Sequence, residues 1–260
     1  MPTTISVNPD VRQKPPSIEG NGLADLYFQW FSSSIADTPE QIKQAHRLRY
    51  DVYCEETGFE PKEDNPGKQE RDPFDEHSAH AVLTHLPTNT VAGTLRIVLP
   101  VPDKPGADLP ARMASSLLDE LPFLPRESTG EISRFTVARE FRKRQQDTLY
   151  ASVYNDEQDR SRDPRRILPH IALGLLQSVF EITLRHNLTH LCAVIDPALL
   201  RLVRRLGLEF HKVGDLIEFH GMRQPIYCDN REILETVHKK RREVWEVITC
   251  RHQDILDGLY

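Results

Sequence analysis

Hydrophobic and polar residues alternate along the chain in patterns that predict both strands and helices. Aromatic residues crowd positions 26–31, which favours a first strand. A helix is expected from Thr38, because Thr38-Pro39-Glu40-Gln41 supplies the N-cap, the first-turn proline and the glutamine of a capping box. Apolar residues then recur every three or four positions, at Ile42, Ala45, Leu48 and Val52.

The next segment combines irregular stretches with β-rich ones. Residues 57–77 lose all periodicity and contain several glycines and prolines, so we expect a long loop, a feature that is often functional in compact domains. Residues 80–86 and 90–99 are rich in β-formers, and Pro87-Thr88-Asn89 between them predicts a hairpin. A proline-rich excursion at 100–129, placed to act as a lid, leads to a third strand at 130–138.

The second half alternates helices and strands. We expect an exposed polar insertion at 145–165, helices at 167–186 and 197–206, strands at 188–195, 208–219 and 225–228, and a charged outer helix at 230–249. This order predicts an α/β fold with one central, mixed and mostly antiparallel sheet flanked by helices. The expected organisation is a flexible arm at 1–25, one domain at 26–228 and a helical extension at 229–260.

Charge and cysteine content narrow the functional classes. The 260 residues carry a net charge of −6, which argues against nucleic acid as a partner. No segment approaches the ~18 uninterrupted apolar residues of a transmembrane helix, and the polar N-terminus does not resemble a secretory signal. We therefore expect a cytoplasmic protein without a transmembrane segment. The cysteines are too dispersed for a disulfide framework or a zinc site: Cys54, Cys192, Cys228 and Cys250.

Charged residues occupy positions where a core would exclude them. Arg49 lies on or beside the apolar stripe of its helix, so it either extends to solvent or faces a polar pocket. Arg96 interrupts an apolar strand, where an arginine usually pairs with a carboxylate. Glu131 and Arg134 share one strand, and regular alternation would direct them to opposite faces, so a shared site requires a β-bulge. Taken alone, Glu131 is better explained as a surface residue at the start of a strand.

Carboxylates and histidines gather at the end of the long loop. Asp72 and Asp75 are available to neutralise arginines. Together with His77 and His80 they are also of the residue types that bind metal ions, but the sequence does not fix their geometry, and a solvated acidic loop explains them as well. We therefore expect no metal.

Several of these residues fall into motifs that occur in a known order. They are Leu48-Arg49-Tyr50-x-Val52-Tyr53, Phe59, Glu70-x-Asp72-x-Phe74-Asp75, Gly93-x-x-Arg96 and Glu131-x-Ser133-Arg134-Phe135. This series resembles the acyl-homoserine-lactone synthases, a family of the GNAT acyltransferase superfamily. A closer resemblance, to PEP-CTERM/exosortase-associated acyltransferases and the related N-acyl amino acid synthases, extends through residues 195–202 and His220-Gly221-x-Arg223-Gln224-Pro225. The resemblance covers roughly residues 25–228.

The resemblance implies a GNAT-like acyltransferase fold and N-acyl transfer from a thioester. It places a polar network at the amine-acceptor site, with Tyr53 and Phe59 as its aromatic wall: Arg49, Asp72, Asp75, Arg96, Glu131, Ser133 and Arg134. Glu131 is then the base, directly or through one water, and Arg134 is its catalytic partner. Tyr53 and Phe59 stand where the synthases usually have phenylalanine and tryptophan, which points away from S-adenosylmethionine as the acceptor.

The donor side is expected along the same strand and the turn after it. In this superfamily, backbone N–H groups such as those from Phe135 to Val137 hold the acyl carbonyl or the pantetheine arm. The turn that follows contains Arg139, Arg142 and Arg144 and lacks the glycines that cradle pyrophosphate in acetyl-CoA users. This basic turn suits an acidic acyl carrier protein, and it is equally explained as a solvated turn.

We therefore expect an N-acyltransferase that moves a fatty acyl group from acyl carrier protein or acyl-CoA to an amino acid or a related amine. No permanently bound cofactor is expected. Two alternatives stay open at this stage. One is a short-chain, CoA-dependent N-acetyltransferase, and the other is a non-catalytic module of the same fold that binds acyl carrier protein or lipid.

Overall fold

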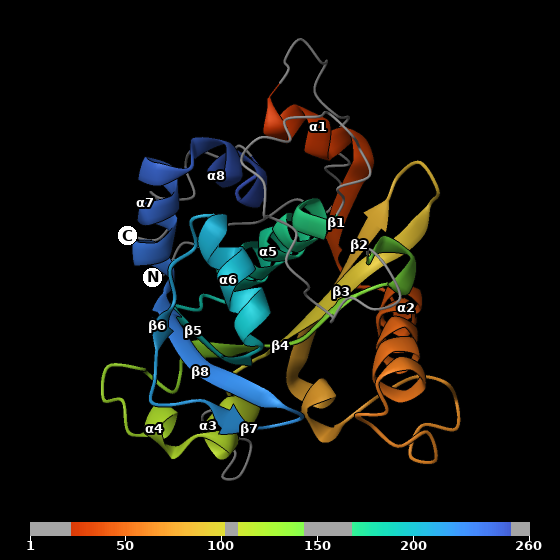
Figure 1. Ribbon diagram of the computed structural model, residues 1–260, viewed down its shortest axis with the longest axis horizontal. Helices are drawn as coiled ribbons and strands as arrows, with labels where there is room; N and C mark the ends of the chain where they lie inside the picture. Colours follow the sequence, from red (N-terminus) through yellow and green to blue (C-terminus); the bar gives the residue numbers. More distant parts are fainter. Residues whose placement is uncertain (1–21, 102–108, 143–167, 251–260) are drawn as a thin grey trace, which may run out of the picture.

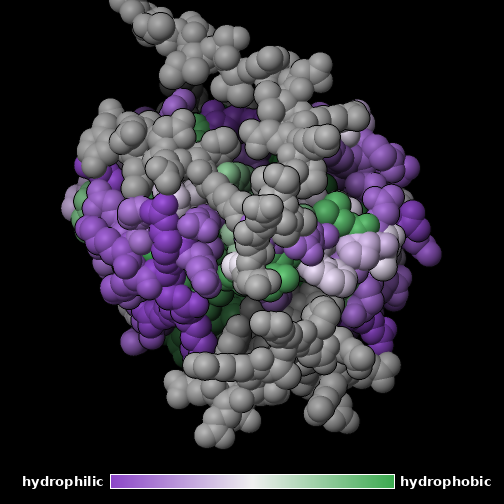
Figure 2. Space-filling model, turned by 90° about the horizontal axis from the view of Figure 1, so that it is seen from above, coloured by the Kyte–Doolittle hydropathy of each residue, from purple (hydrophilic) through white to green (hydrophobic). Residues whose placement is uncertain are grey.

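The computed structural model describes residues 22–101, 109–142 and 168–250. The first 21 residues of the expected arm and the whole insertion expected at 145–165 lie outside this part of the chain. Seen from above, the described surface has hydrophobic side chains near its centre and hydrophilic ones on either side (Figure 2).

An eight-stranded sheet runs through the molecule in the order β1-β2-β3-β4-β5-β8-β6, and β7 pairs with β8 beside this path (Figure 1). The only parallel pair among these strands is β4 with β5. The expected α/β fold with a mixed, mostly antiparallel sheet is thus confirmed. The strands are β1 (Phe31–Ile35), β2 (Ser78–His85), β3 (Thr90–Val98), β4 (Thr129–Val137), β5 (His190–Ile195), β6 (His211–Lys212), β7 (Ile217–Glu218) and β8 (Met222–Asp229).

Helices cover both faces of this sheet. The long helix α5 packs on β1 to β4, and α2 packs on β2, β3 and β4. The two helices lie on opposite faces, because Gly93 of β3 faces Ile171 and Leu175 of α5, whereas Arg96, three residues further along, faces α2. The helices are α1 (Leu23–Trp30), α2 (Pro39–Tyr50), α3 (Pro110–Ala114), α4 (Ser116–Asp119), α5 (Leu168–Arg185), α6 (Pro197–Arg205), α7 (Asn230–Lys240) and α8 (Arg242–Ile248).

The aromatic run at 26–31 is mostly helical, so the strand expected there is wrong. Residues 23–30 form α1, and β1 begins only at Phe31. Tyr27 and Phe31 are four residues apart and stack with ring centroids 5.9 Å apart, as neighbours on one helical face do. Tyr27 is buried and donates a hydrogen bond to Gln177 Oε1 of α5 at 2.9 Å. Packing against α5 therefore overrides the β-propensity of the aromatic residues.

The C-terminal segment is also more deeply buried than expected. It forms two helices, α7 and α8, in place of the single outer helix. Val244, Trp245, Val247 and Ile248 of α8 are buried in the same core as α5. The two helices pack side by side (Figure 1). The expected strand at 208–219 is also wrong, since it contains only the two-residue strands β6 and β7. The domain boundary proposed after residue 228 stays a prediction.

The functional region is positioned by two irregularities of β4. Its parallel pairing with β5 ends at Glu131↔Cys192, and no register partners follow. On its other side, Thr94↔Thr136 is followed by Arg96↔Ser133, so β4 has one residue more than β3 between these pairs. Arg134 lies in this β-bulge with φ 51°, a left-handed conformation that residues other than glycine seldom adopt. The sheet is therefore irregular at the centre of β4.

No helix of the described segments combines the length and the apolar character needed to cross a bilayer.

Candidate active site

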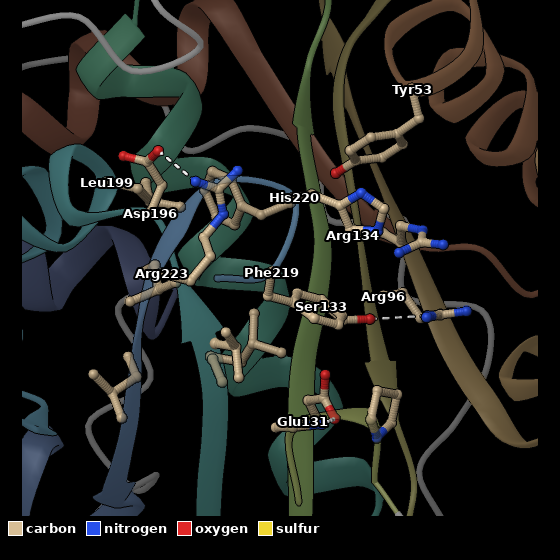
Figure 3. A pocket seen from close by; sticks show the side chains of 18 of the residues that line it. Tyr53, Arg96, Glu131, Ser133, Arg134, Asp196, Leu199, Phe219, His220 and Arg223 are labelled. Carbon is tan, nitrogen blue, oxygen red and sulfur yellow. Dashed lines mark hydrogen bonds and ion pairs between the residues drawn. The ribbon is translucent and has the colours of Figure 1, made fainter. Parts of the chain in front are cut away.

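A cavity of about 280 Å³ lies beside β4, β5 and α6 where the sheet opens. One part of its wall is polar and includes Glu60, Asp72, Arg96, Glu131, Ser133, Arg134 and Arg223 (Figure 3). Another part is apolar and includes Leu176, Ala193, Ile195, Leu199, Val203, Phe210 and Ile226. The cavity therefore has a charged region and an apolar region next to each other.

The β-bulge places Ser133 and Arg134 on the same face of β4. Ser133 Oγ accepts a hydrogen bond from Arg96 Nε at 3.0 Å. Arg134 Nη2 donates to Asp72 Oδ2 at 3.1 Å, and Arg96 Nη1 donates to Asp72 Oδ1 at 2.5 Å. Both neighbours thus reach the same Arg96–Asp72 pair. The bulge that a shared site requires is present.

Three arginines and three carboxylates form a closed ring of alternating charges. Arg49 binds Asp75 through two hydrogen bonds of 2.7 and 3.0 Å, and Asp75 accepts another from Arg96 at 2.8 Å. Asp72 links Arg96 to Arg134, as described above. Glu70 closes the ring by accepting from Arg134 Nη2 at 2.8 Å and from Arg49 Nε at 2.5 Å. We call these residues the charge ring: Arg49, Asp75, Arg96, Asp72, Arg134 and Glu70.

The charge ring satisfies groups that would otherwise be costly to bury. Arg49 is fully buried and Arg96 is 1% exposed, and an unpaired charge in such a place would cost several kcal/mol. Burial alone would favour the neutral acid, but the neighbouring guanidinium groups hold the pKa values of Glu70 and Asp75 below their ordinary values. Both carboxylates are therefore ionised at neutral pH. Arg49 faces a polar network and does not extend to solvent.

A short helix fixes two carboxylates of the ring. Residues 73–77, expected to be irregular, form the 3₁₀ helix η2 (Pro73–His77). Asp72 Oδ1 accepts from Phe74 N at 2.9 Å, while Asp75 Oδ2 accepts from Asp72 N at 2.9 Å. This reciprocal cap, followed by proline at the first position, is visible in the sequence as Asp72-Pro73-x-Asp75. The spacing could have predicted the helix.

Arg49, Asp75 and Glu70 lie behind the cavity wall, whereas Asp72, Arg96 and Arg134 line it. The residues behind the wall therefore hold the wall residues in place through the hydrogen bonds of the charge ring. Among the residues expected to bind substrate, Arg49 and Asp75 have no contact with the cavity.

Histidines beside the ring form a cluster of metal-ligand types with Asp75. Ligand atoms of His46, Asp75 and His80 lie within 4.8 Å of one another, whereas the sequence suggested Asp72 and His77 in place of His46. The two oxygens of Asp75 already accept four hydrogen bonds, three of them from guanidinium groups that would repel a cation. Burial, reinforced by Arg49, lowers the pKa of His46 to about 4 and that of His80 to about 3. The cluster therefore fits a neutral structural pair better than a metal site.

Glu131 lies at the floor of the cavity below Ser133 (Figure 3). It is 4% exposed, so it is not a surface residue at the start of a strand. Its Oε2 accepts a hydrogen bond from the backbone N–H of Ala111 at 2.6 Å. Burial raises its pKa to about 7, although the Ala111 hydrogen bond and the positive charges of Arg96 and Arg134 oppose the shift. Glu131 can therefore exchange a proton near neutral pH.

Aromatic residues form the wall beside the bulge. Tyr53 belongs to η1 (Asp51–Glu56), a π-helical turn that continues α2, and such turns often occur at functional sites. The guanidinium carbon of Arg134 lies 5.2 Å from the centre of the Tyr53 ring. The Phe59 ring lies 5.5 Å from that of His220, which belongs to the turn between β7 and β8. Two distant parts of the chain therefore meet at the cavity.

Only one of the residues expected to bind the acyl donor lines the cavity in the described part of the chain. Phe135 is buried and lines the cavity, but Val137 is buried in the core and does not line it. Arg139 is exposed on η3 (Arg139–Phe141), and Arg142 forms an ion pair with Glu56. Arg144 lies outside the described residues.

Several cavity residues have no role that could be assigned from the sequence. Asp196 and Arg223 form an ion pair at 3.1 Å in the wall (Figure 3). In the sequence they belong only to the motifs at 195–202 and 220–225, to which no role was assigned. The apolar wall was also missed, because its residues come from elements that are adjacent only in the folded chain, among them α5 with Leu176, α6 with Leu199 and β8 with Ile226.

Comparison with known proteins agrees with this architecture. Residues 48–152 match the family model of the acetyltransferase (GNAT) domain. No curated protein sequence matches the chain. Residues 48–152 are thus similar to a GNAT acetyltransferase domain, and the expected GNAT-like fold is confirmed.

Solved structures share the fold at low sequence identity. TofI, in a ternary complex with an inhibitor and MTA, is 19% identical with a TM-score of 0.53, and the match covers 80% of this chain and 96% of that one. FeeM, an N-acyl amino acid synthase from uncultured soil microbes, is 16% identical with a TM-score of 0.52, covering 79% and 94%. BjaI, a CoA-dependent acyl-homoserine lactone synthase solved with SAM and isopentyl-CoA, is 18% identical with a TM-score of 0.50, covering 85% and 88%.

Proposed function

We propose that this protein is an N-acyltransferase that moves a fatty acyl group from a thioester to the amine of an amino acid or a related small molecule. One observation carries the proposal. A single cavity joins a buried carboxyl group with a pKa near 7 to an apolar wall large enough for more than an acetyl group. Amide formation from an acyl thioester needs both parts side by side.

The apolar wall supports a fatty acyl donor. Leu199 and Val203 of α6 face the cavity together with Leu176 and Ile226. An alkyl chain that leaves water for such a wall gains about 0.8 kcal/mol per buried CH₂ group. An acetyl group would use little of this surface, so the cavity favours the long-chain activity over the short-chain alternative.

Glu131 is the proposed general base. An amine is protonated at neutral pH and must lose a proton before its nitrogen can attack the thioester carbon. A carboxylate with a pKa near 7 is matched to this task, because it is partly ionised and still holds a proton well. Its Oε1 accepts no hydrogen bond from the described residues, whereas Oε2 is held by Ala111. Glu131 would take the proton directly or through one water.

The reaction then proceeds by addition and elimination. The amine nitrogen forms a bond to the carbonyl carbon, and the carbonyl oxygen becomes an oxyanion. Past Glu131, β4 has no register partner on β5, so alternate backbone groups of β4 face the opening. Backbone N–H groups on this edge would stabilise the oxyanion. The carbon–sulfur bond breaks as the carbonyl reforms, and the thiolate leaves and takes a proton.

The charge ring would hold the reacting groups in place and set the local potential. Its three guanidinium groups balance three carboxylates, and Glu60, which also pairs with Arg134 at 2.9 Å, adds one more negative charge. The polar wall therefore favours the approach of a cationic amine, and the hydrogen-bonded ring keeps Ser133 and Arg134 fixed.

The donor carrier and the biological setting belong to the same proposal. BjaI is CoA-dependent and FeeM is an N-acyl amino acid synthase, which supports a thioester donor and an amino acid acceptor at the level of the fold. We propose acyl carrier protein or CoA as the carrier. The cytoplasmic location and the association with exosortase systems rest on the sequence patterns and the family resemblance.

Thiol release from defined donors tests the function. The purified 260-residue chain is incubated with dodecanoyl-CoA, dodecanoyl acyl carrier protein or acetyl-CoA, each with a set of amino acids, and free thiol is measured. We expect release from a dodecanoyl donor that depends on the amino acid. Preference for acetyl-CoA would support the short-chain alternative, and stoichiometric donor binding without thiol release would support the non-catalytic one.

A further inference from the structure

The cavity wall contains three arginines that differ in how many of their donors are engaged. Arg96 donates to Asp72, Asp75 and Ser133, and Arg134 donates to Glu60, Glu70 and Asp72. Both belong to the charge ring, where each guanidinium is already balanced by carboxylates. A substrate anion would have to break the ring in order to bind either of them.

Arg223 is engaged differently. Its Nη1 donates to Asp196 Oδ2 at 3.1 Å and to the carbonyl oxygen of Met222 at 3.2 Å. Within the described part of the chain, its Nε and Nη2 have no hydrogen-bond partner. The side chain is 16% exposed, lines the cavity and lies across it from the bulge of β4 (Figure 3). It therefore presents unused guanidinium donors at a partly desolvated wall.

The surroundings of Arg223 hold its side chain in place. Asp196 is the N-cap of α6, and its Oδ1 accepts from Ala198 N at 2.7 Å, so its Oδ2 is oriented toward Arg223. The turn before Arg223 is tight, with φ 51° at His220 and φ 93° at Gly221. The positive φ of Gly221 favours glycine, and a Cβ atom there would be in ordinary van der Waals contact with Arg223 Nη1 at 3.4 Å, so the turn lies directly against the guanidinium.

We infer that Arg223 binds a carboxylate of the acceptor and makes the enzyme selective for amines that carry a free carboxylate. The inference rests on the proposed function and adds a residue and a chemical requirement to it. Asp196 engages one donor, and the remaining guanidinium donors offer the paired geometry that carboxylates accept. An acceptor held in this way would lie between the β8 wall, where its carboxylate binds, and the β4 wall, where Glu131 receives the proton.

Comparison of amino acids with their methyl esters tests the inference. Glycine, leucine, phenylalanine and tyrosine, each as the free acid and as the methyl ester, are offered with dodecanoyl-CoA to the wild-type chain. A charged hydrogen-bond pair predicts a preference of about tenfold or more in kcat/KM for the free acid. Arg223→Gln should raise the acceptor KM by a similar factor, leave the donor KM unchanged and abolish the preference for the free acid.

Two further variants make the result specific. Arg223→Lys keeps the charge without the planar fork and should retain part of the preference. Arg231→Gln is the control, because Arg231 also pairs with a carboxylate, that of Glu235 at 3.2 Å, but does not line the cavity. It should behave as wild type.

The possible outcomes separate the inference from the proposed function. Equal use of acids and esters by the wild type would overturn the inference while leaving the acyltransferase intact. A rise in donor KM in Arg223→Gln would assign Arg223 to the donor and would also overturn it. Absence of thiol release with every amine would instead reject the proposed function.

Discussion

Glu131 Oε2 accepts the backbone N–H of Ala111 at 2.6 Å, which ties the proposed base to the first turn of α3. Glu131 therefore holds the start of α3 against β4, in addition to its proposed role as the base. It also makes glutamine the informative substitution, because an amide oxygen can still accept this hydrogen bond while the group can no longer take a proton.

Glu131→Gln should reduce kcat by about 10²–10⁴-fold, the usual contribution of a general base. The acceptor and donor KM values should change little, since the side chain keeps its size. Thiol release under saturating substrates measures the effect, and the circular dichroism spectrum serves as the folding control. Activity within a few-fold of wild type would reject Glu131 as the base.

The proposed base also predicts how activity depends on pH. Because the pKa of Glu131 is raised to about 7, the ionised form gains population as the pH increases through that value. The log of kcat/KM should therefore rise on the acid side and level off above pH 7. A profile with its acid limb near pH 4.5 would indicate a carboxyl group of ordinary pKa and contradict the assignment.

The same shift predicts a stability change of opposite direction. The folded chain holds the Glu131 proton more tightly than the unfolded chain, so this contribution to stability is present below about pH 4.5 and is lost as the pH rises through about 7. In Glu131→Gln this side chain no longer titrates, so the variant does not lose this contribution to stability as the pH rises. Thermal melting at pH 6 and at pH 8 should show the variant gaining relative to wild type at the higher pH, whereas a constant difference would argue against the raised pKa.

The buried histidines predict a loss of stability in acid. The pKa values of His46 and His80 are about 4 and about 3 in the folded chain, below the ordinary value of about 6.5. Their contribution is therefore full above pH 6.5 and falls as the pH decreases toward 4, because the unfolded chain takes up protons first. Urea unfolding of wild type and His80→Gln at pH 7 and pH 5 should show a smaller decline in the variant. An equal decline in the free energy of unfolding of both proteins would show that His80 does not contribute to the loss of stability in acid.

The charge ring predicts a large penalty when one member is removed. Arg49→Met should lower the free energy of unfolding by about 3–5 kcal/mol, because Glu70 and Asp75 would remain buried without their partner. Urea unfolding measures this change. Lys43→Met serves as the control, since Lys43 is exposed on the same helix. A loss below 1 kcal/mol would mean that the ring relaxes around the gap.

Much of the architecture could be predicted from the sequence because its signals are local. The capping box at Thr38, the hairpin around residues 87–89 and the cap at Asp196 each depend on neighbouring residues. The sequence also indicates which charged residues need a partner, because apolar segments rarely contain unpaired charges: Arg49, Arg96 and Glu131.

The remaining features depend on the tertiary structure. Arg134 has φ 51° although it is not glycine, and residue type alone therefore does not reveal the bulge. Which carboxylate meets which arginine depends on η2 folding back onto α2 and β3. Arg223 reaches the cavity because β8 pairs with β5, a contact between segments distant in the sequence. The strand expected at 26–31 was wrong because packing against α5 outweighs local propensity.

The central claim is N-acyl transfer of a fatty chain, and direct detection of the product by mass spectrometry tests it most directly. The wild-type chain and Glu131→Gln are incubated with dodecanoyl-CoA or dodecanoyl acyl carrier protein and the same set of amino acids. We predict an N-dodecanoyl amino acid formed in proportion to the thiol released, and a greatly reduced yield with the variant. Absence of any N-acyl product from the wild type, or equal yields from both proteins, would contradict the account.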